Sequence, residues 1–302
     1  MLAHAVPRLR TDIHPLRRGP GSVQLGQHQD TGLVVEGLTD DEVALLQRLG
    51  RAADPPSPVT AELTATLSTA RAGRLAALLG TLRERRLLAE PDGTAYPCEP
   101  GDPRRRRHQI VVVSGAGALP ETVAELLRAG GVGQVQVGEQ AADALDFELR
   151  HDPVTRPPDL VVLLARDAVR AGRGEPWRRR GVPHLPVVAH RQRLVVGPLV
   201  STGGPCLGCL DRHRADRDQA WPLLLDQLAP EPGFGVRAVE VPSPLAELGS
   251  GIVAMVGHAW LDGQPVPQGL SIEVGLPWPG VDYRQWQRHP RCHCVTDPSP
   301  GR

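Results

Sequence analysis

The sequence predicts an α/β protein in which a winged helix-turn-helix module precedes a Rossmann-type domain. Three observations indicate this fold: short strand patterns followed by helix patterns before residue 97, apolar strands that alternate with helices after residue 107, and a proline-broken, arginine-rich stretch between the two. We therefore expect domains at residues 1–96 and 108–302, joined by a linker at residues 97–107.

The N-terminal module shows strand patterns at residues 16–18, 22–25 and 32–38, and helix patterns at residues 40–49, 60–69 and 72–86. The first helix begins with a capping box, because the Thr39 hydroxyl can accept a hydrogen bond from the amide of Glu42 while the Glu42 carboxylate reaches back. Three strands and three helices within residues 1–96 predict a winged helix-turn-helix.

The C-terminal part alternates apolar strands with helices. Strands are expected at residues 109–113, 134–137, 159–164, 185–190 and 194–196, with helices between several of them. Continuous apolar strands of this kind are typical of a parallel sheet covered on both faces. A later helix starts at Ser243-Pro244, and we expect its apolar side chains to pack in the core: Leu245, Leu248, Ile252, Met255 and Val256.

Composition excludes several classes of chemistry. The chain contains neither lysine nor asparagine, so all 34 of its basic residues are arginine. It can therefore form no Schiff base and offers no lysine to a phosphate. Net charge is zero, so no general field attracts the protein to nucleic acid or to an anionic membrane, and we expect neither as a partner.

The N-terminal residues lack the apolar run of a signal peptide, and no stretch reaches the ~20 apolar residues of a membrane span. We therefore expect a cytoplasmic protein. In a reducing compartment, clustered cysteines are metal ligands more often than disulfides.

Four of the five cysteines form two close pairs, Cys206 with Cys209 and Cys292 with Cys294. A Cys-x-x-Cys turn places two thiolates on one side of a metal, and a second pair completes a tetrahedron. We predict a structural zinc ion at these four residues. Redox-active thiols and unrelated cysteines are the alternatives, and His213, His289 or His293 could replace one thiol.

A glycine loop follows the first apolar strand of the C-terminal part. Gly115 and Gly117 match the start of a dinucleotide-binding fingerprint, and Glu139 lies where a ribose-binding acid is expected. Pro120, however, stands at the third glycine position, and no basic residue occurs between Val113 and Arg128. The loop is therefore either a nucleotide site or, as we favour, a tight turn kept for the fold.

Several motifs resemble one protein family. A Gly-Pro-Leu-Val strand at residues 197–200 leads into Pro-Cys-x-x-Cys-Leu-Asp-x-His-Arg at residues 205–214, and the chain closes with His-Pro-x-Cys-x-Cys at residues 289–294. With the winged module and the Gly-x-Gly loop, these motifs resemble the ThiF-like proteins of ribosomal-peptide (bacteriocin) maturation. These are relatives of ubiquitin-activating enzymes, called cyclodehydratases or leader-peptide-binding proteins of azole-forming systems.

The resemblance implies a leader-recognition domain (a RiPP recognition element) fused to a zinc-bearing ThiF-like domain. In that family the precursor's leader peptide adds a strand to the third strand of the winged module, against its third helix. Transferred to this chain, the peptide-binding residues are Leu33, Val34, Val35, Glu36, Leu75, Leu79 and Arg83. The four cysteines match the family's zinc ligands, and the family's dimers through the Rossmann-like half imply a homodimer.

Adenylating members of the family use a full glycine loop with asparagine, arginine and lysine around ATP, and this chain lacks much of that set. We therefore expect no ATP and no catalysis by this chain alone. The expected function is to bind a precursor peptide and present it to a separate YcaO-type cyclodehydratase. The alternatives are an active ATP-dependent adenylating enzyme of the ThiF family and a winged-helix DNA-binding regulator.

Overall fold

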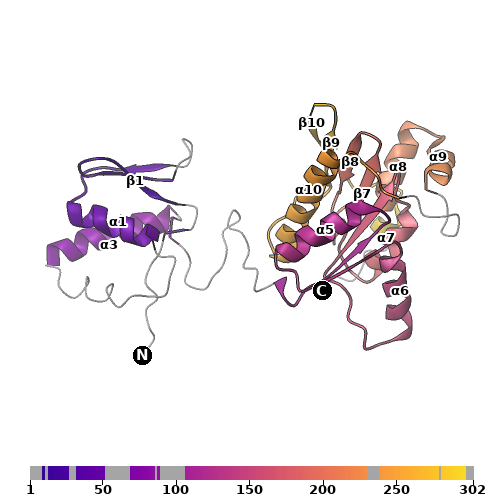
Figure 1. Ribbon diagram of the computed structural model, residues 1–302, viewed down its shortest axis with the longest axis horizontal. Helices are drawn as coiled ribbons and strands as arrows, with labels where there is room; N and C mark the ends of the chain where they lie inside the picture. The colour runs from indigo at the N-terminus through magenta and orange to yellow at the C-terminus, as the bar shows by residue number, and fades with distance from the viewer. Residues whose placement is uncertain are drawn as a thin grey trace. The chain divides into compact units, whose positions relative to one another are not determined.

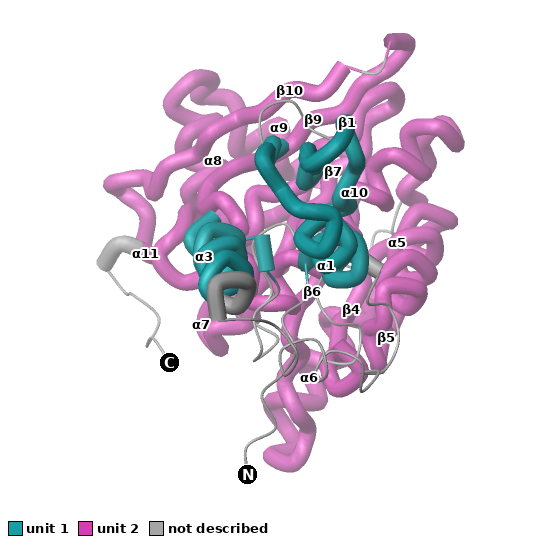
Figure 2. Tube along the Cα trace, turned by 90° about the vertical axis from the view of Figure 1, so that its left-hand side faces the viewer, with its two compact units in different colours: residues 1–100 teal, residues 101–302 magenta. Residues whose placement is uncertain are grey.

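The computed structural model describes residues 9–10, 13–26, 32–51, 69–85, 87–88, 106–229, 238–278 and 280–296. The chain divides into two compact units, residues 1–100 and 101–302 (Figure 2). The helix expected at residues 60–69 lies outside the described residues except for Thr69, as do Cys98 and most of the linker expected at residues 97–107. The domain boundaries therefore stay predictions.

The N-terminal unit contains a three-stranded antiparallel sheet in the order β1-β2-β3 (Figure 1). Its strands are β1 (Pro15–Gly19), β2 (Ser22–Leu25) and β3 (Leu33–Val35), and its described helices are α1 (Asp40–Arg51) and α3 (Thr69–Glu84). β3 is shorter than the strand expected at residues 32–38. One apolar core holds these elements together: Leu9, Ile13, Val23, Leu25, Val43, Leu46, Leu49, Leu82, Leu87 and Leu88.

The start of α1 is capped as the sequence predicts. The amide of Thr39 donates to Glu42 Oε2 at 2.7 Å, and the amide of Glu42 donates to the Thr39 hydroxyl at 3.4 Å. Arg74 of α3 also donates to the buried Glu42 carboxylate at 2.9 Å, and this hydrogen bond is the first reason why the pKa of Glu42 falls to about 2. The capping box therefore also ties α3 to α1.

The C-terminal unit is built on a seven-stranded sheet in the order β10-β9-β8-β7-β6-β4-β5. The strands are β4 (Ile110–Ser114), β5 (Gln134–Gly138), β6 (Leu160–Arg166), β7 (His184–His190), β8 (Arg193–Val196), β9 (Leu270–Gly275) and β10 (Gly280–Gln285). β5, β4, β6 and β7 are parallel, whereas β8, β9 and β10 are antiparallel. The expectation of a parallel sheet is thus wrong for β8, because the two residues between β7 and β8 are too few for a crossover.

Helices cover both faces of this sheet (Figure 1). One face packs against α5 (Ala118–Ala129) and α10 (Ser243–Leu261), and the other against α6 (Ala141–His151), α7 (Ala171–Arg179) and α8 (Leu207–Arg217). Two further helices are α9 (Trp221–Leu228) and α11 (His293–Thr296). Within the described residues, no helix is both long enough and apolar enough to cross a membrane.

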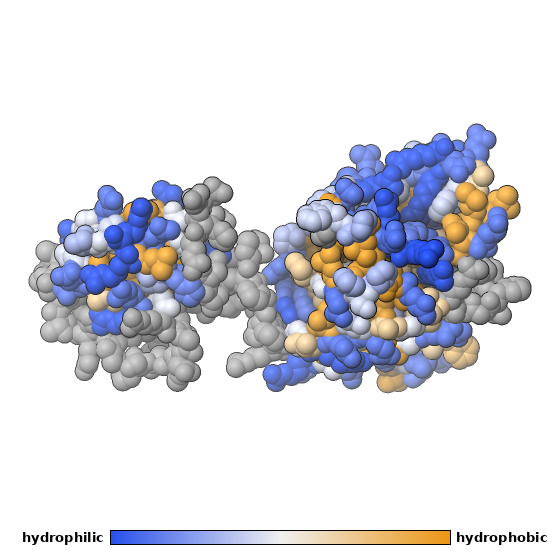
Figure 3. All heavy atoms as spheres, turned by 45° about the horizontal axis from the view of Figure 1, so that its top comes forward, coloured by the Kyte–Doolittle hydropathy of each residue, from blue (hydrophilic) through white to orange (hydrophobic). Residues whose placement is uncertain are grey.

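The helix α10 meets the sheet partly through small residues, and this corrects part of the core assigned from its sequence. Leu245 is buried, and Ile252 and Val256 pack on the core as expected, but Leu248 and Met255 do not. A Cβ atom at Gly249 would lie 1.9 Å from Leu194 Cδ2, so the helix and the sheet approach closely at that glycine. The opposite side of α10 faces solvent, where Leu248 is 42% and Met255 is 72% exposed. Hydrophobic residues are accordingly visible among hydrophilic ones on the surface of this unit (Figure 3).

Candidate metal centre

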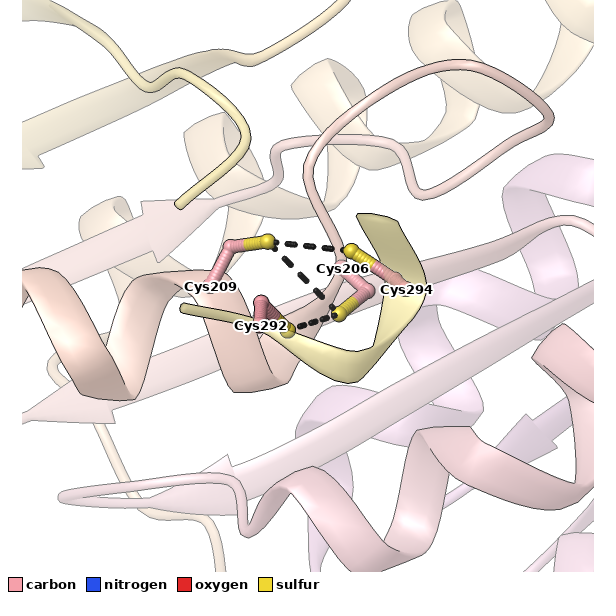
Figure 4. A group of neighbouring side chains, drawn as sticks. All are labelled: Cys206, Cys209, Cys292 and Cys294. Atoms are coloured by element: carbon pink, nitrogen blue, oxygen red, sulfur yellow. Dashed lines mark hydrogen bonds between the residues drawn. The ribbon is translucent and has the colours of Figure 1, made fainter. Parts of the chain in front are cut away.

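The four paired cysteines converge beside the first turn of α8. Cys206 is the residue immediately before α8, and the amide of Cys209 donates to the carbonyl oxygen of Cys206 at 2.9 Å, which closes the Cys-x-x-Cys turn. Cys292 precedes α11 and Cys294 lies within it. All four thiols are buried and point toward one another (Figure 4).

The spacing of the sulfur atoms fits a tetrahedral metal. Cys206 Sγ lies 3.8 Å from Cys209 Sγ and 3.6 Å from Cys292 Sγ, and Cys209 Sγ lies 3.3 Å from Cys294 Sγ. A zinc ion with Zn–S distances near 2.3 Å sets its four sulfurs about 3.8 Å apart along the edges of a tetrahedron. The buried cluster is therefore compatible with a structural zinc ion, and its four sulfurs would leave no coordination position open.

The thiols of the cluster perturb one another's protonation. The hydrogen bond from Cys206 Sγ lowers the pKa of Cys209 to about 4, and the same hydrogen bond together with burial raises the pKa of Cys206. Burial also raises the pKa of Cys294 to about 11. Burial and the neighbouring thiols therefore oppose the thiolate form of Cys206 and Cys294, whereas a dication favours the thiolate at each ligand.

His289 supports the cluster rather than joining it. Its Nε2 atom lies 2.8 Å from Asp216 Oδ2, while its Nδ1 atom accepts from the amide of Arg291 at 3.1 Å. Nε2 therefore carries the proton and donates to Asp216, which holds the pKa of that carboxyl below its usual range. The carbonyl oxygen of His289 accepts from the amide of Cys292 at 2.9 Å, so the ring fixes the loop that carries a thiol.

The other histidines named as possible ligands are also placed elsewhere. His213 Nε2 lies 3.0 Å from the carbonyl oxygen of Gln287, and its ring packs edge-on against His289 at 4.9 Å. His293 lies in α11 between two of the thiols, and it is exposed. Four sulfur ligands are thus the simplest set that the described residues offer.

The glycine loop between β4 and α5 is covered by another part of the chain. The amide of Val239 donates to the carbonyl oxygen of Ala116 at 2.7 Å, and Val239 is buried. A Cβ atom at Gly117, whose φ is +101°, would lie 3.2 Å from the amide nitrogen and 3.3 Å from the carbonyl oxygen of Val239. Gly117 therefore serves a close backbone contact within this chain.

Gly115 and Glu139 are also accounted for by the fold. A Cβ atom at Gly115 would lie 2.8 Å from Leu164 Cβ, so this glycine allows β6 to approach the loop. Glu139 follows β5, and its carbonyl oxygen accepts from the Ser114 hydroxyl at 3.3 Å while its side chain is exposed. The structure thus places the three residues around the carboxyl end of β4.

Sequence reasoning missed charged residues at this end of the sheet. The chain order reverses between β4 and β6, which is where ligands bind in open α/β sheets. Arg173 of α7 donates to the Ser114 hydroxyl at 3.1 Å. Asp167 follows β6, and its backbone φ of +65° is unusual for a residue other than glycine. The apolar strand that ends in Arg166-Asp167 could have indicated charged residues at this edge of the sheet. The approach of Arg173, in contrast, depends on tertiary packing.

The residues expected to bind peptide lie on β3 and α3. Val34 is 38% exposed, whereas Leu33 and Val35 are half-buried and pack on the core of the N-terminal unit. Of the remaining four, Leu75 and Leu79 are half-buried, and Glu36 and Arg83 are exposed. β3 pairs only with β2, so in the described part of this unit its other edge is free.

No protein-family model and no curated protein matches this sequence. Solved structures do match. A heterocyclase in complex with substrate and cofactor has a TM-score of 0.66 at 17% identity over 93% of this chain. The heterocyclase TruD has a TM-score of 0.66 at 16% identity over 95% of this chain. E. coli MccB with ATP has a TM-score of 0.57 at 12% identity, over 95% of this chain and 98% of MccB.

The chain shares its fold with MccB and with the heterocyclases. It spans 38% and 42% of the lengths of the two heterocyclases, but nearly all of MccB. At these identities the similarity concerns the fold, and it agrees with the resemblance to ThiF-like proteins drawn from the sequence motifs.

Proposed function

We propose that this protein binds a precursor peptide through its N-terminal unit and presents it to a partner YcaO-type cyclodehydratase, without adenylating the peptide itself. The observation that carries the proposal is the edge of β3 that no described strand covers. An edge strand offers unpaired amide and carbonyl groups, and an extended peptide can add to it as a further strand.

The surroundings of β3 suit an apolar peptide segment. We interpret β1, β2, β3, α1 and α3 as a winged helix-turn-helix of the peptide-recognition type. Leu79 of α3 and Val35 of β3 pack on the same core, and Arg74 donates to the carbonyl oxygen of Gly37 just after β3 at 3.1 Å. A peptide on β3 would contact the exposed Val34, with Leu75 and Arg83 of α3 as further contacts.

The glycine loop supports presentation over catalysis. Val239 occupies the space beside Gly117, and Pro120 removes one amide from the first turn of α5, where a phosphate would be bound. The chain has no lysine to contribute. In this proposal the ThiF-like domain is a scaffold, and zinc at the four cysteines stabilises it.

The solved relatives agree with a peptide-linked role. MccB has been solved with MccA, and one heterocyclase with substrate and cofactor. This chain corresponds to about two fifths of the heterocyclases, and in our proposal the ring-forming reaction belongs to the partner enzyme.

Two exposed apolar residues on opposite edges of the N-terminal sheet provide a matched test. Val34 on β3 is 38% exposed and Leu16 on β1 is 41% exposed. Val34→Asp should weaken binding of a fluorescently labelled precursor peptide by about tenfold or more, because it places a charge at the peptide strand. Leu16→Asp should leave the affinity unchanged. Equal effects of the two variants, or no binding by the wild type, would contradict peptide binding at β3.

ATP-dependent adenylation is the second candidate, and one observation favours it. Asp167 and Arg173 lie at the carboxyl end of the sheet, where the strand order reverses. Calorimetry with Mg²⁺ and ATP separates the two functions. We expect no heat of binding, and an affinity near 1 μM would replace presentation by adenylation.

A further inference from the structure

A cavity leads from the surface of the C-terminal unit to the cysteine cluster. It measures about 350 Å³ and is lined by three of the thiols: Cys206, Cys292 and Cys294. Cys209, in contrast, is fully buried. Gly172 of α7 lines the same cavity and is exposed, so the cavity opens to solvent. A small solute can therefore reach three of the four thiols.

Gly208, in the first turn of α8, leaves two of these sulfurs uncovered. It lines the cavity, and a Cβ atom at this position would lie 3.5 Å from Cys292 Sγ and 3.6 Å from Cys206 Sγ. These are ordinary van der Waals distances, so an alanine would fit and would cover both sulfurs. Because the backbone of Gly208 is helical, its conformation does not require glycine. The missing side chain is what exposes the two sulfurs to the cavity.

The shortest distances between sulfurs join two segments of the chain that are far apart in sequence. Cys206 Sγ lies 3.6 Å from Cys292 Sγ and 3.8 Å from Cys209 Sγ, its partner in the Cys-x-x-Cys turn. Cys209 Sγ lies closest to Cys294 Sγ, at 3.3 Å. Each of the two shortest contacts therefore links the start of α8 to residues 292–294 (Figure 4).

Positive charge is in excess around the cavity. Three arginines line it, Arg178, Arg179 and Arg212, with Glu175 as the acidic residue. A cysteine that binds a metal is a thiolate, which is also the form that attacks oxidants. Guanidinium groups beside a thiolate stabilise the hydroxide that leaves when the thiolate attacks a peroxide. Accessible thiolates in positive surroundings are the ones that oxidants modify.

We propose that the cluster is a site of oxidation by hydrogen peroxide, and that its first product is a disulfide between Cys206 and Cys292. The Cys206 thiolate attacks one peroxide oxygen, the O–O bond breaks, and the departing hydroxide takes a proton from solvent, which leaves a sulfenic acid. The Cys292 thiolate then attacks that sulfur, the S–S bond forms, and a second hydroxide leaves and is protonated. The two sulfurs lose two electrons, and one peroxide becomes two waters.

The disulfide replaces the connection that a metal would provide. It joins residues 86 positions apart, so the end of the chain stays attached to α8. Only Cys209 and Cys294 then remain as ligands, and a zinc ion held by two thiols is released. Disulfides in a reducing compartment are usually transient and serve redox sensing. The site is thus a reversible oxidation sensor, a role that goes beyond peptide binding and does not depend on it.

Disulfide mapping tests the pairing. The full-length Cys98→Ser variant, whose remaining cysteines are the four of the cluster, is treated with one equivalent of hydrogen peroxide, blocked with iodoacetamide and digested with trypsin. Cleavage after arginine places the first cysteine pair in residues 194–212 and the second in residues 292–302. We expect a Cys206–Cys292 bond between these peptides, located by fragmentation, and release of zinc to a chromogenic chelator. A disulfide of any other pairing, or none, would overturn the proposal.

Covering the two sulfurs tests the route of the oxidant. Gly208→Ala should keep the zinc content and slow zinc release by peroxide about threefold or more, because its methyl group lies against both sulfurs. Gly251→Ala is the matched control, since it makes the same change within α10 and meets no atom within 4 Å. It should release zinc at the wild-type rate. Equal rates for Gly208→Ala and the wild type would exclude entry through this cavity, and zinc binding that dithiothreitol cannot restore would exclude a sensor.

Discussion

The helices α8 and α5 each follow a loop that comes after a strand. The start of α8 carries cysteines and forms a candidate metal site, whereas the glycine loop before α5 forms no open binding site. At α8, one thiol just before the helix and one in its first turn meet two more from residues 292–294, with sulfurs 3.3 to 3.8 Å apart. At α5, the space beside the loop is occupied by Val239. A helix start therefore becomes a binding site through what distant segments bring to it.

The difference also separates two kinds of evidence. Cysteine side chains carry their own chemistry, so four of them in one place define a ligand type. Glycines supply only space and backbone conformation, which a ligand or another part of the same chain can use.

Loss of one thiol should have the largest effect. Cys206→Ser should abolish the binding of one zinc ion per chain and lower the free energy of unfolding of the C-terminal unit by at least about 3 kcal/mol, because metal binding is coupled to folding. Zinc analysis and tryptophan fluorescence in urea would measure both, since all the tryptophans lie in that unit: Trp177, Trp221, Trp260, Trp278 and Trp286. Cys98→Ser is the matched control, and equal zinc content in both variants would contradict the assignment.

Removal of the support under Cys292 should have an intermediate effect. His289→Ala deletes the ring that joins Asp216 and Arg291 beside the cluster, and it should weaken zinc binding roughly 10- to 100-fold in competition with a chelator. His190→Ala, which removes a ring that lies 3.6 Å from Asp167, should leave the affinity unchanged. Complete loss of zinc in His289→Ala would instead make this histidine a ligand.

The covered loop at α5 should be sensitive to a single methyl group. Gly117→Ala should lower the free energy of unfolding by about 1–3 kcal/mol, because the positive φ and the backbone of Val239 both oppose a Cβ atom. Gly172→Ala is the control, since no atom lies within 4 Å of its added methyl group. Unchanged stability of Gly117→Ala in urea unfolding would mean that Val239 does not hold the loop closed.

The smallest effect is expected at α1, whose start is satisfied by its own side chains. Glu42→Gln should destabilise α1 by about 1 kcal/mol at neutral pH, because it removes the carboxylate that caps the helix and pairs with Arg74. The effect stays small because Arg74 is largely exposed to solvent. The pKa of Glu42 is lowered from 4.5 to about 2, so its contribution is present above pH 4.5 and is lost as the pH falls toward 2. Hydrogen exchange of the α1 amides should show this pH dependence in the wild type and not in Glu42→Gln.

Local signals predicted much of the fold. The capping box at Thr39 and Glu42 and the apolar strands β4, β6 and β7 follow from short-range patterns, and the structure confirms them. β9 and β10 were not predicted, because β10 is exposed along its whole length and has no apolar period. For α10, the expected core positions Leu248 and Met255 were wrong, since Gly249 allows a close contact with the sheet that hydrophobicity does not indicate.

The sequence by itself determined the ligand chemistry, because four cysteines in two close pairs and the absence of lysine and asparagine are properties of composition and spacing. Only the tertiary structure decided which loops are open and which edges are free. Closure of the glycine loop depends on Val239, some 120 residues away in the chain, and the edges of β3 and β10 depend on strand order. Contacts between distant segments are set by packing of the whole chain, which no local pattern records.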